Sequence, residues 1–348
     1  MLEIGIKSNR KQTKTFVALL TVLTLFITTV IATGCGKDEK KVIHFGSSAG
    51  ESGEFFGLVA VAKELGYIDE ELGKLGFEVE YSGFTNGVAV NEGITADEVD
   101  LSTLGDVPTA VGIANDIGLT WIGVGLTYNN AIVVPENSDI QTPEDLEGKR
   151  VAFGVGTTYQ YLWESVVKEF GIDASKVEVL NLNKSDAISA LNSGNADAVV
   201  LGENQAKVLE TDGTVRILLN TEDYPQWAPQ DMIVGRTDFL KENPEVGVAL
   251  HKALIRARES FKEDPEKYYV TLSARQLEEH PELGAKIYDK DNGEFKNLIA
   301  EIQESNVERE QKLADFLYSV ERVTAKADIS ANLDDSYYEK AKQELGVE

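Results

Sequence analysis

The chain has little cysteine and little histidine: one cysteine and three histidines in 348 residues. The single Cys35 has no partner for a disulfide within the chain, so the folded part must be stable through its core alone. His44, His251 and His280 are scattered, and none stands at metal-ligand spacing with another histidine or cysteine. The sequence therefore predicts neither a thiol catalyst nor a zinc site.

Signatures of catalysis are also missing. The sequence contains no serine nucleophile elbow, no phosphate-binding loop with its lysine and no dinucleotide fingerprint. The segment Gly154-Val155-Gly156 lacks the third glycine that a dinucleotide site requires. Carboxylates are abundant, so counting them does not exclude a site made of paired acids. We expect a protein that is not an enzyme and that uses no cofactor.

Positive charge is scarce. The chain has 33 Lys and Arg against 59 Asp and Glu, a formal net charge of −26. Residues 1–34 carry +3, so the remainder carries −29. A surface of this charge repels phosphates, which argues against nucleic acid as a partner. The acidic residues are spread along the chain without forming a tail.

The N-terminus predicts export. Positive residues precede an apolar run, Phe16–Ala32, and this run leads into Ala32-Thr33-Gly34-Cys35. The four residues resemble the bacterial lipobox, although that pattern usually has Leu where Ala32 stands. We expect a signal peptide over 1–34, lipidation of Cys35 and a charged tether over 35–41. The alternative is a helical anchor that ends in a lone cysteine. Both interpretations place the rest of the chain outside the membrane, bound to its extracytoplasmic face.

From residue 42 onward, apolar strands alternate with Gly/Ser turns and amphipathic helices, which predicts a mostly parallel α/β fold. Beyond Asp238 the pattern is almost entirely helical and includes expected helices over Val246–Phe261 and Phe295–Val320. We expect one lobe built from both ends of the chain and a second lobe inserted between them. The expected segments are 42–130 for the first part of lobe one, 131–231 for lobe two, and 232–348 for the return segment with the C-terminal helices.

Three turns that follow predicted strands suit a ligand, because ligands of open α/β folds bind beyond the carboxyl ends of strands, at helix N-termini. These turns are Gly46-Ser47-Ser48, Gly105-Asp106-Val107 and Gly156-Thr157-Thr158. Turns commonly consist of such residues, and Asp106 suits a helix cap, so a purely structural role stays open for each turn.

An ordered set of short segments carries a family resemblance. The segments are Ala62-Lys63-Glu64-Leu65-Gly66-Tyr67, Gly105-Asp106-Val107-Pro108, Ala131-Ile132-Val133-Val134-Pro135, Asp145-Leu146-Glu147-Gly148-Lys149-Arg150-Val151-Ala152, Gly156-Thr157-Thr158, Ala196-Asp197-Ala198 and Asn243-Pro244-Glu245. Taken together, they resemble the nitrate-, aliphatic-sulfonate- and taurine-binding proteins of bacterial importers. The resemblance covers about residues 42 to 262, and no single motif decides it.

The resemblance implies a two-lobed periplasmic-binding-protein fold of the second type, with a cleft that closes on ligand and a partner permease with its ATPase. One departure concerns the pocket. Where relatives often carry Trp, this chain has Gly202, and Glu203 follows it. Glu203 suits an amine, although it could equally be a solvated surface acid. The candidate ligand-binding residues are Ser47, Ser48, Gly105, Asp106, Tyr128, Gly156, Thr157, Thr158 and Glu203.

We therefore expect a monomeric solute-binding lipoprotein of an ABC importer that takes a small sulfonate, nitrate or taurine-like compound, with a zwitterion as the first choice. Alternatives are a binding protein for a heterocyclic vitamin precursor, a sensor ectodomain of the same fold, and an enzyme related to pyrimidine-precursor synthases.

Overall fold

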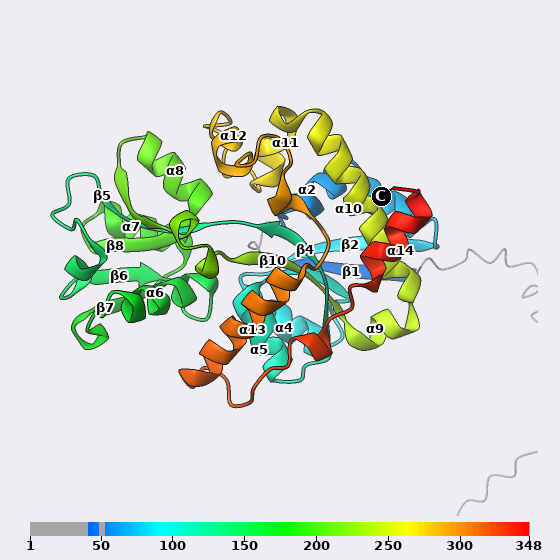
Figure 1. Cartoon of the computed structure of the whole chain (residues 1–348), viewed down its shortest axis with the longest axis horizontal. Helices are drawn as coiled ribbons and strands as arrows, with labels where there is room; N and C mark the ends of the chain where they lie inside the picture. The colour runs from blue at the N-terminus through cyan, green and yellow to red at the C-terminus, as the bar shows by residue number, and fades with distance from the viewer. Residues whose placement is uncertain (1–40, 49–52, 348) are drawn as a thin grey trace, which may run out of the picture. The chain divides into compact units, whose positions relative to one another are not determined.

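A computed structural model describes residues 41–48 and 53–347, and the strands of this part form two five-stranded sheets. The expected signal peptide and Cys35 lie outside the described residues, as does the expected tether apart from Lys41. Figure 1 shows the two sheets with helices on both faces of each. An α/β fold with helices on both sheet faces is what the alternation of strands and helices predicts.

The first sheet has the strand order β2-β1-β3-β10-β4. β1, β2 and β3 are parallel, whereas β10 runs antiparallel to both of its neighbours. The strands are β1 (Lys41–Ser47), β2 (Phe77–Gly83), β3 (Leu101–Gly105), β4 (Leu119–Thr127) and β10 (Gln230–Arg236).

The second sheet has the order β7-β6-β8-β5-β9, with β6, β7 and β8 parallel and β5 antiparallel to β8 and β9. The two sheets thus share one plan: three parallel strands and an antiparallel strand beside them. The strands are β5 (Asn130–Pro135), β6 (Arg150–Phe153), β7 (Glu178–Asn181), β8 (Ala198–Gly202) and β9 (Val215–Asn220).

Strands β10 and β5 contain continuous apolar runs because helices cover both faces of each sheet. In β10, Ile233 packs into the core on one face, while Met232 and Val234 pack into the core on the other. In β5 the same alternation sends Ile132 to one core and Val133 to the other. A continuous apolar run is therefore a strand buried on both sides.

Two chain crossings join the sheets. The first is the two-residue link Tyr128-Asn129 between β4 and β5, and the second leads from β9 to β10. The crossings touch, since the Tyr128 amide donates to the Pro229 carbonyl at 3.1 Å. The second crossing contains two short 3₁₀ helices, η4 (Thr221–Asp223) and η5 (Pro225–Trp227).

Helices of the first lobe come from both halves of the chain, coloured blue to cyan and yellow to red in Figure 1. α10 packs on α2 and α3 over one face of the sheet, and α13 packs on α5 over the other. The helices are α2 (Gly57–Glu64), α3 (Tyr67–Gly73), α4 (Gly87–Thr95), α5 (Asp106–Ala114), α9 (Thr237–Glu242), α10 (Pro244–Glu263), α11 (Pro265–Leu272), α12 (Leu283–Tyr288), α13 (Glu304–Ser319) and α14 (Ser336–Leu345).

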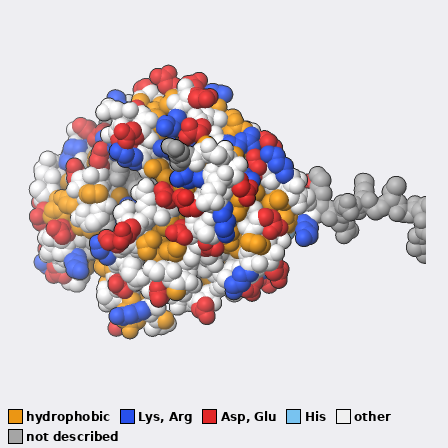
Figure 2. Space-filling view, turned by 45° about the vertical axis from the view of Figure 1, so that its right-hand side comes forward, with side chains coloured by type: hydrophobic (Ala, Val, Ile, Leu, Met, Phe, Trp, Pro, Cys, Tyr) orange, Lys and Arg blue, Asp and Glu red, His pale blue; other side chains and the backbone are white. Residues whose placement is uncertain are grey.

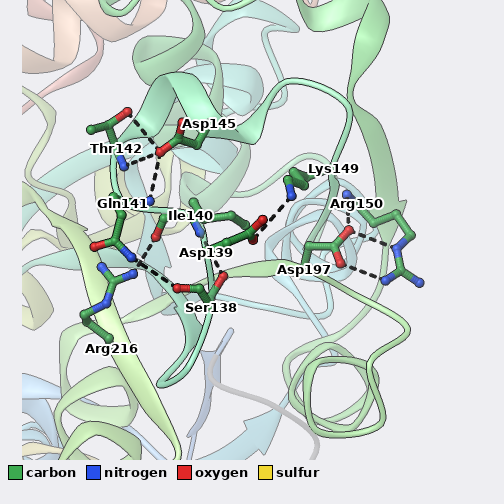
Figure 3. Close-up of polar contacts among 10 residues, drawn as sticks. All are labelled: Ser138, Asp139, Ile140, Gln141, Thr142, Asp145, Lys149, Arg150, Asp197 and Arg216. Atoms are coloured by element: carbon green, nitrogen blue, oxygen red, sulfur yellow. Dashed lines mark hydrogen bonds and ion pairs between the residues drawn. The ribbon is translucent and has the colours of Figure 1, made fainter.

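Helices of the second lobe follow its parallel strands: α6 (Thr158–Glu169), α7 (Lys184–Asn192) and α8 (Glu203–Thr211), with the 3₁₀ helices η2 (Pro143–Leu146) and η3 (Ala174–Lys176). η2 begins after Thr142, and the carboxylate of Asp145 closes this short 3₁₀ turn by accepting the Thr142 amide at 2.9 Å. Nearby, Asp197 ties β6 to β8 by accepting the Arg150 amide and guanidinium. Figure 3 shows both interactions.

The single helix expected over Phe295–Val320 is wrong. Phe295 has a left-handed backbone, the 3₁₀ helix η6 spans Lys296–Leu298, and α13 begins only at Glu304. The intervening backbone is fixed by tertiary contact, because the Ala300 carbonyl accepts the Val124 amide of β4 at 3.1 Å. A hydrogen bond to a strand so distant in sequence leaves no trace in local periodicity. A second 3₁₀ helix, η7 (Ser330–Asn332), precedes α14.

The described surface is strongly acidic but mixed. Figure 2 shows Asp and Glu side chains scattered among Lys and Arg over the visible face, without one dominant acidic patch. Within residues 41–48 and 53–347, no helix combines the length and the apolar character needed to span a bilayer.

Candidate ligand-binding site

A cavity of about 790 Å³ is lined by residues from both sheets and from the C-terminal region. Its lining contains the turns after the parallel strands β1, β3, β6, β7 and β8, together with the crossing Tyr128-Asn129. This is where an open α/β fold is expected to hold a ligand, beyond the carboxyl ends of its strands. The volume suits a small organic molecule.

The cavity brings together most of the residues predicted from the sequence. Those that line it are Ser48, Gly105, Tyr128, Gly156, Thr157, Thr158 and Glu203.

Two predicted residues are not part of the lining. Ser47 is fully buried, and its hydroxyl donates to the Glu54 carbonyl. Asp106 is also buried and accepts the amides of Val107 at 2.7 Å and Gln230 at 3.3 Å. Burial raises the pKa of Asp106 to about 6. Asp106 therefore links the start of α5 to β10 by hydrogen bonds and does not face the cavity.

The hydroxyls of the α6 turn are engaged within the protein. Thr157 caps α6 by accepting the Tyr159 amide at 3.2 Å, and it donates to the Gly154 carbonyl at 2.7 Å. The Thr158 hydroxyl accepts the side-chain amide of Asn130 at 3.3 Å. Backbone amides here are partly engaged as well, since the Gly156 amide donates to the Gln160 side chain at 2.8 Å and the Gln160 amide donates to the Thr157 carbonyl at 3.0 Å.

Glu203 is buried and fully partnered. Its carboxylate accepts the side-chain amides of Asn129 and Asn220, each at 3.0 Å, and pairs with the Lys290 ammonium at 3.2 Å. These three donors tie the first crossing, β9 and the C-terminal region together. A ligand amine would have to displace Lys290 to reach this carboxylate.

Helix N-termini give the cavity a favourable field for an anion. The first residues of α4, α7 and α8 contribute to the lining, as does the cap of α6. Each N-terminus carries a partial positive charge that acts at contact distance. Salt screens the distant surface acids over about 8 Å. The high negative charge of the chain is therefore compatible with an anionic ligand in this cavity.

The lining residues that the sequence interpretation missed include Asp231 near the start of β10 and Arg309 in α13. Asp231 is buried, and burial, aided by the charge of Asp106, raises its pKa well above the usual range. Burial also lowers the pKa of Arg309. A carboxylate at the head of an otherwise apolar strand was a usable signal for Asp231. Arg309, in a charged helical stretch, gave none.

Histidine plays no part in the lining. His251 is buried in α10 against the Gly247 carbonyl, and His280 lies beside Asp212. Among the described residues, no group of three or more His, Cys, Asp or Glu is placed to hold a metal ion.

The family model described as NMT1/THI5 like matches residues 54–268, more than half of the chain. The chain belongs to the NMT1/THI5-like family. Its relatives include a protein of Bacillus subtilis named "Putative aliphatic sulfonates-binding protein", 27% identical over 82% of this chain and 84% of the relative. Another is the taurine-binding periplasmic protein of Escherichia coli, 29% identical over 55% of this chain and 60% of the relative.

Among solved structures, the periplasmic sulfonate-binding protein SsuA from Methylobacillus flagellatus superimposes with a TM-score of 0.74. It is 23% identical, and the match covers 88% of this chain and 96% of the other. The predicted family and the predicted two-lobed periplasmic-binding-protein fold are confirmed. These relatives of the NMT1/THI5-like chain are binding proteins, and the prediction that it is not an enzyme is confirmed by them.

Proposed function

We propose that this chain is the extracytoplasmic solute-binding component of an ABC importer, which captures a small sulfonate or taurine-like compound and delivers it to a permease. The observation that carries the proposal is the cavity of about 790 Å³, walled by both sheets and surrounded by helix N-termini. The names of the B. subtilis and E. coli relatives support sulfonates and taurine over a heterocyclic vitamin precursor.

Calorimetry on the purified full-length chain in detergent tests the ligand class. Taurine, short alkanesulfonates and nitrate are titrated alongside an aminopyrimidine vitamin precursor. We expect micromolar or tighter binding of at least one sulfonate. Binding of the aminopyrimidine alone would replace the proposal with the vitamin-precursor alternative.

We further propose that ligand closes two lobes, 42–130 with 232–348 and 131–231, about the crossings at Tyr128-Asn129 and before β10. The division of the strands between the two sheets supports these boundaries. Solution scattering should show a smaller radius of gyration with ligand. An unchanged radius in saturating ligand would contradict closure.

Membrane attachment through Cys35 is part of the same proposal and rests on the small-residue run before that cysteine. Cells that express Cys35→Ala should release the protein from the membrane or retain the uncleaved precursor. If the variant is cleaved and extracted like wild type, the lipid anchor is wrong. A permease and an ATPase encoded beside this chain would favour transport, whereas a neighbouring kinase would favour sensing.

A further inference from the structure

Buried polar atoms without a hydrogen-bond partner are few in the described part of the chain, and two belong to residues that line the cavity. They are Oδ2 of Asp231 and Nε of Arg309. A buried polar group without a hydrogen-bond partner lowers the stability of the folded protein. Such groups are therefore expected where a ligand supplies the missing hydrogen bond. These two groups thus differ from Thr157 and Glu203, whose polar atoms are already engaged.

Asp231 is held in place by the sheet. It is the second residue of β10, paired with Gly105 of β3 and Leu126 of β4. Its Oδ2 lies so close to β4 that a Cβ added to Gly125 would stand only 2.7 Å away. Asp231 thus lines the cavity and holds against β4 a buried Oδ2 that has no partner among the described residues and can accept a hydrogen bond. A cationic donor from a ligand would stabilise the charged form of Asp231, which burial disfavours when no ligand is bound.

Arg309 offers the opposite charge. It lies in α13, half-buried, and its buried Nε has no hydrogen-bond partner among the described residues. Its neighbour Glu310 is fully buried, and burial raises the pKa of that carboxyl well above its usual range. Burial thus disfavours the charged form of Glu310, which is the form that would compensate Arg309. Asp106 acts on Arg309 only through its charge, since the Asp106 carboxylate binds backbone amides.

We propose that Arg309 binds the anionic head group of the ligand and Asp231 binds its amine, so that the cavity selects an amino-sulfonate over a plain alkanesulfonate. The proposal rests on the proposed function and names the ligand class within it. It also moves the recognition of an amine from Glu203 to Asp231. Arg309 comes from the C-terminal region, so the end of the chain completes the site. The guanidinium fork matches the oxygens of a sulfonate as it matches those of a phosphate.

The test compares taurine with ethanesulfonate, which lacks only the amine, by calorimetry on the full-length chain in detergent. Wild type should bind taurine at least tenfold more tightly. Arg309→Met should lower the affinity for both ligands by roughly 10- to 100-fold, as expected for lost hydrogen bonds to a charged group. Asp231→Asn should weaken taurine by roughly tenfold or more and change ethanesulfonate by less than about threefold.

Matched controls carry the same charge changes outside the cavity. Lys312→Gln lies one turn further along α13, and Asp238→Asn lies just beyond β10, and both side chains are exposed. Neither variant should change either affinity. Arg309→Lys keeps the charge and should retain part of the binding of both ligands. If Arg309→Met shows no thermal unfolding transition, and so is not folded, Arg309→Lys serves as the test variant in its place.

The outcomes separate the two proposals. If wild type binds sulfonates but Asp231→Asn weakens taurine and ethanesulfonate equally, the assignment of the amine is wrong and the proposed function stands. If Arg309→Met, or Arg309→Lys in its place, binds both ligands like wild type, the assignment of the anion is wrong. If wild type binds ethanesulfonate as tightly as taurine, this inference fails and the proposed function stands. If wild type binds none of the sulfonates, the proposed function fails and this inference fails with it.

Discussion

The two walls of the cavity differ in how their polar groups are used. On the wall formed by α6 and α8, the hydroxyl of Thr157 and the carboxylate of Glu203 have protein partners. On the opposite wall, Asp231 and Arg309 each have a buried polar atom without one. Position in the cavity therefore does not identify a ligand contact by itself. Whether a polar atom already has a hydrogen-bond partner in the protein separates residues that stabilise the cavity from residues that can bind a ligand.

The largest expected effect is a loss of stability when Glu203, on the wall whose polar groups have protein partners, is replaced. Glu203→Ala should lower the free energy of unfolding by about 2–4 kcal/mol, because it leaves Asn129 and Asn220 without their acceptor and Lys290 with only the half-exposed Glu222. Lys290 is partly exposed, which keeps the loss below that of a fully buried pair. Urea denaturation measures it.

Glu222→Ala is the matched control, since Glu222 also pairs with Lys290, at 3.1 Å, but is half exposed. It should cost less than about 1 kcal/mol. Equal losses for the two variants would contradict a structural role for Glu203.

A second prediction concerns the buried acid behind Arg309. Glu310→Met should raise the free energy of unfolding by about 1–3 kcal/mol, because it replaces a buried carboxyl without hydrogen-bond partners by an apolar side chain of similar length. Thermal unfolding should show a higher Tm. Glu310→Gln, which keeps a polar group at this position, should gain less. A lower Tm for Glu310→Met would show that Glu310 stabilises the fold.

A third prediction tests the cap of α6. Thr157→Ala should cost about 1 kcal/mol of stability, because the Tyr159 amide loses its acceptor. Its effect on ligand affinity should be smaller than that of Arg309→Met. Thr157→Ser restores the hydroxyl and should recover most of the stability. If Thr157→Ala abolishes binding while stability is unchanged, the hydroxyl itself contacts the ligand.

The smallest effect is expected at a contact outside the main cavity. Arg322, just beyond α13, donates to Glu164 of α6 at 2.9 Å and so connects the two lobes. Because the pair is solvent-exposed, Arg322→Gln should weaken ligand binding by less than about 1 kcal/mol. Added salt should narrow the difference in affinity between wild type and the variant. A tenfold loss of affinity in Arg322→Gln would make this pair part of the closing mechanism.

Much of the fold could be predicted because its signals are local. Apolar strands such as Ala198–Gly202, and turns such as Gly105-Asp106-Val107, are visible in short windows, and the structure places a strand and a helix start there. The missed break at Ile299–Gln303 depends on the hydrogen bond from Val124 to Ala300, which no local window contains. Local patterns thus locate elements, and distant contacts decide where some of them stop.

By itself, the sequence determined the order of strands and helices and placed polar turns at strand ends, because hydrophobic periodicity and turn chemistry act over a few residues. Only the tertiary structure decided which polar side chains are free to meet a ligand. Glu203 is occupied by Lys290, 87 residues away in the chain. Asp231 and Arg309 reach the same cavity from different elements, each with a buried polar atom that has no partner in the described part of the chain. Partners so far apart along the chain are assigned by folding, since a hydrogen bond depends on distance in space and not on separation in sequence.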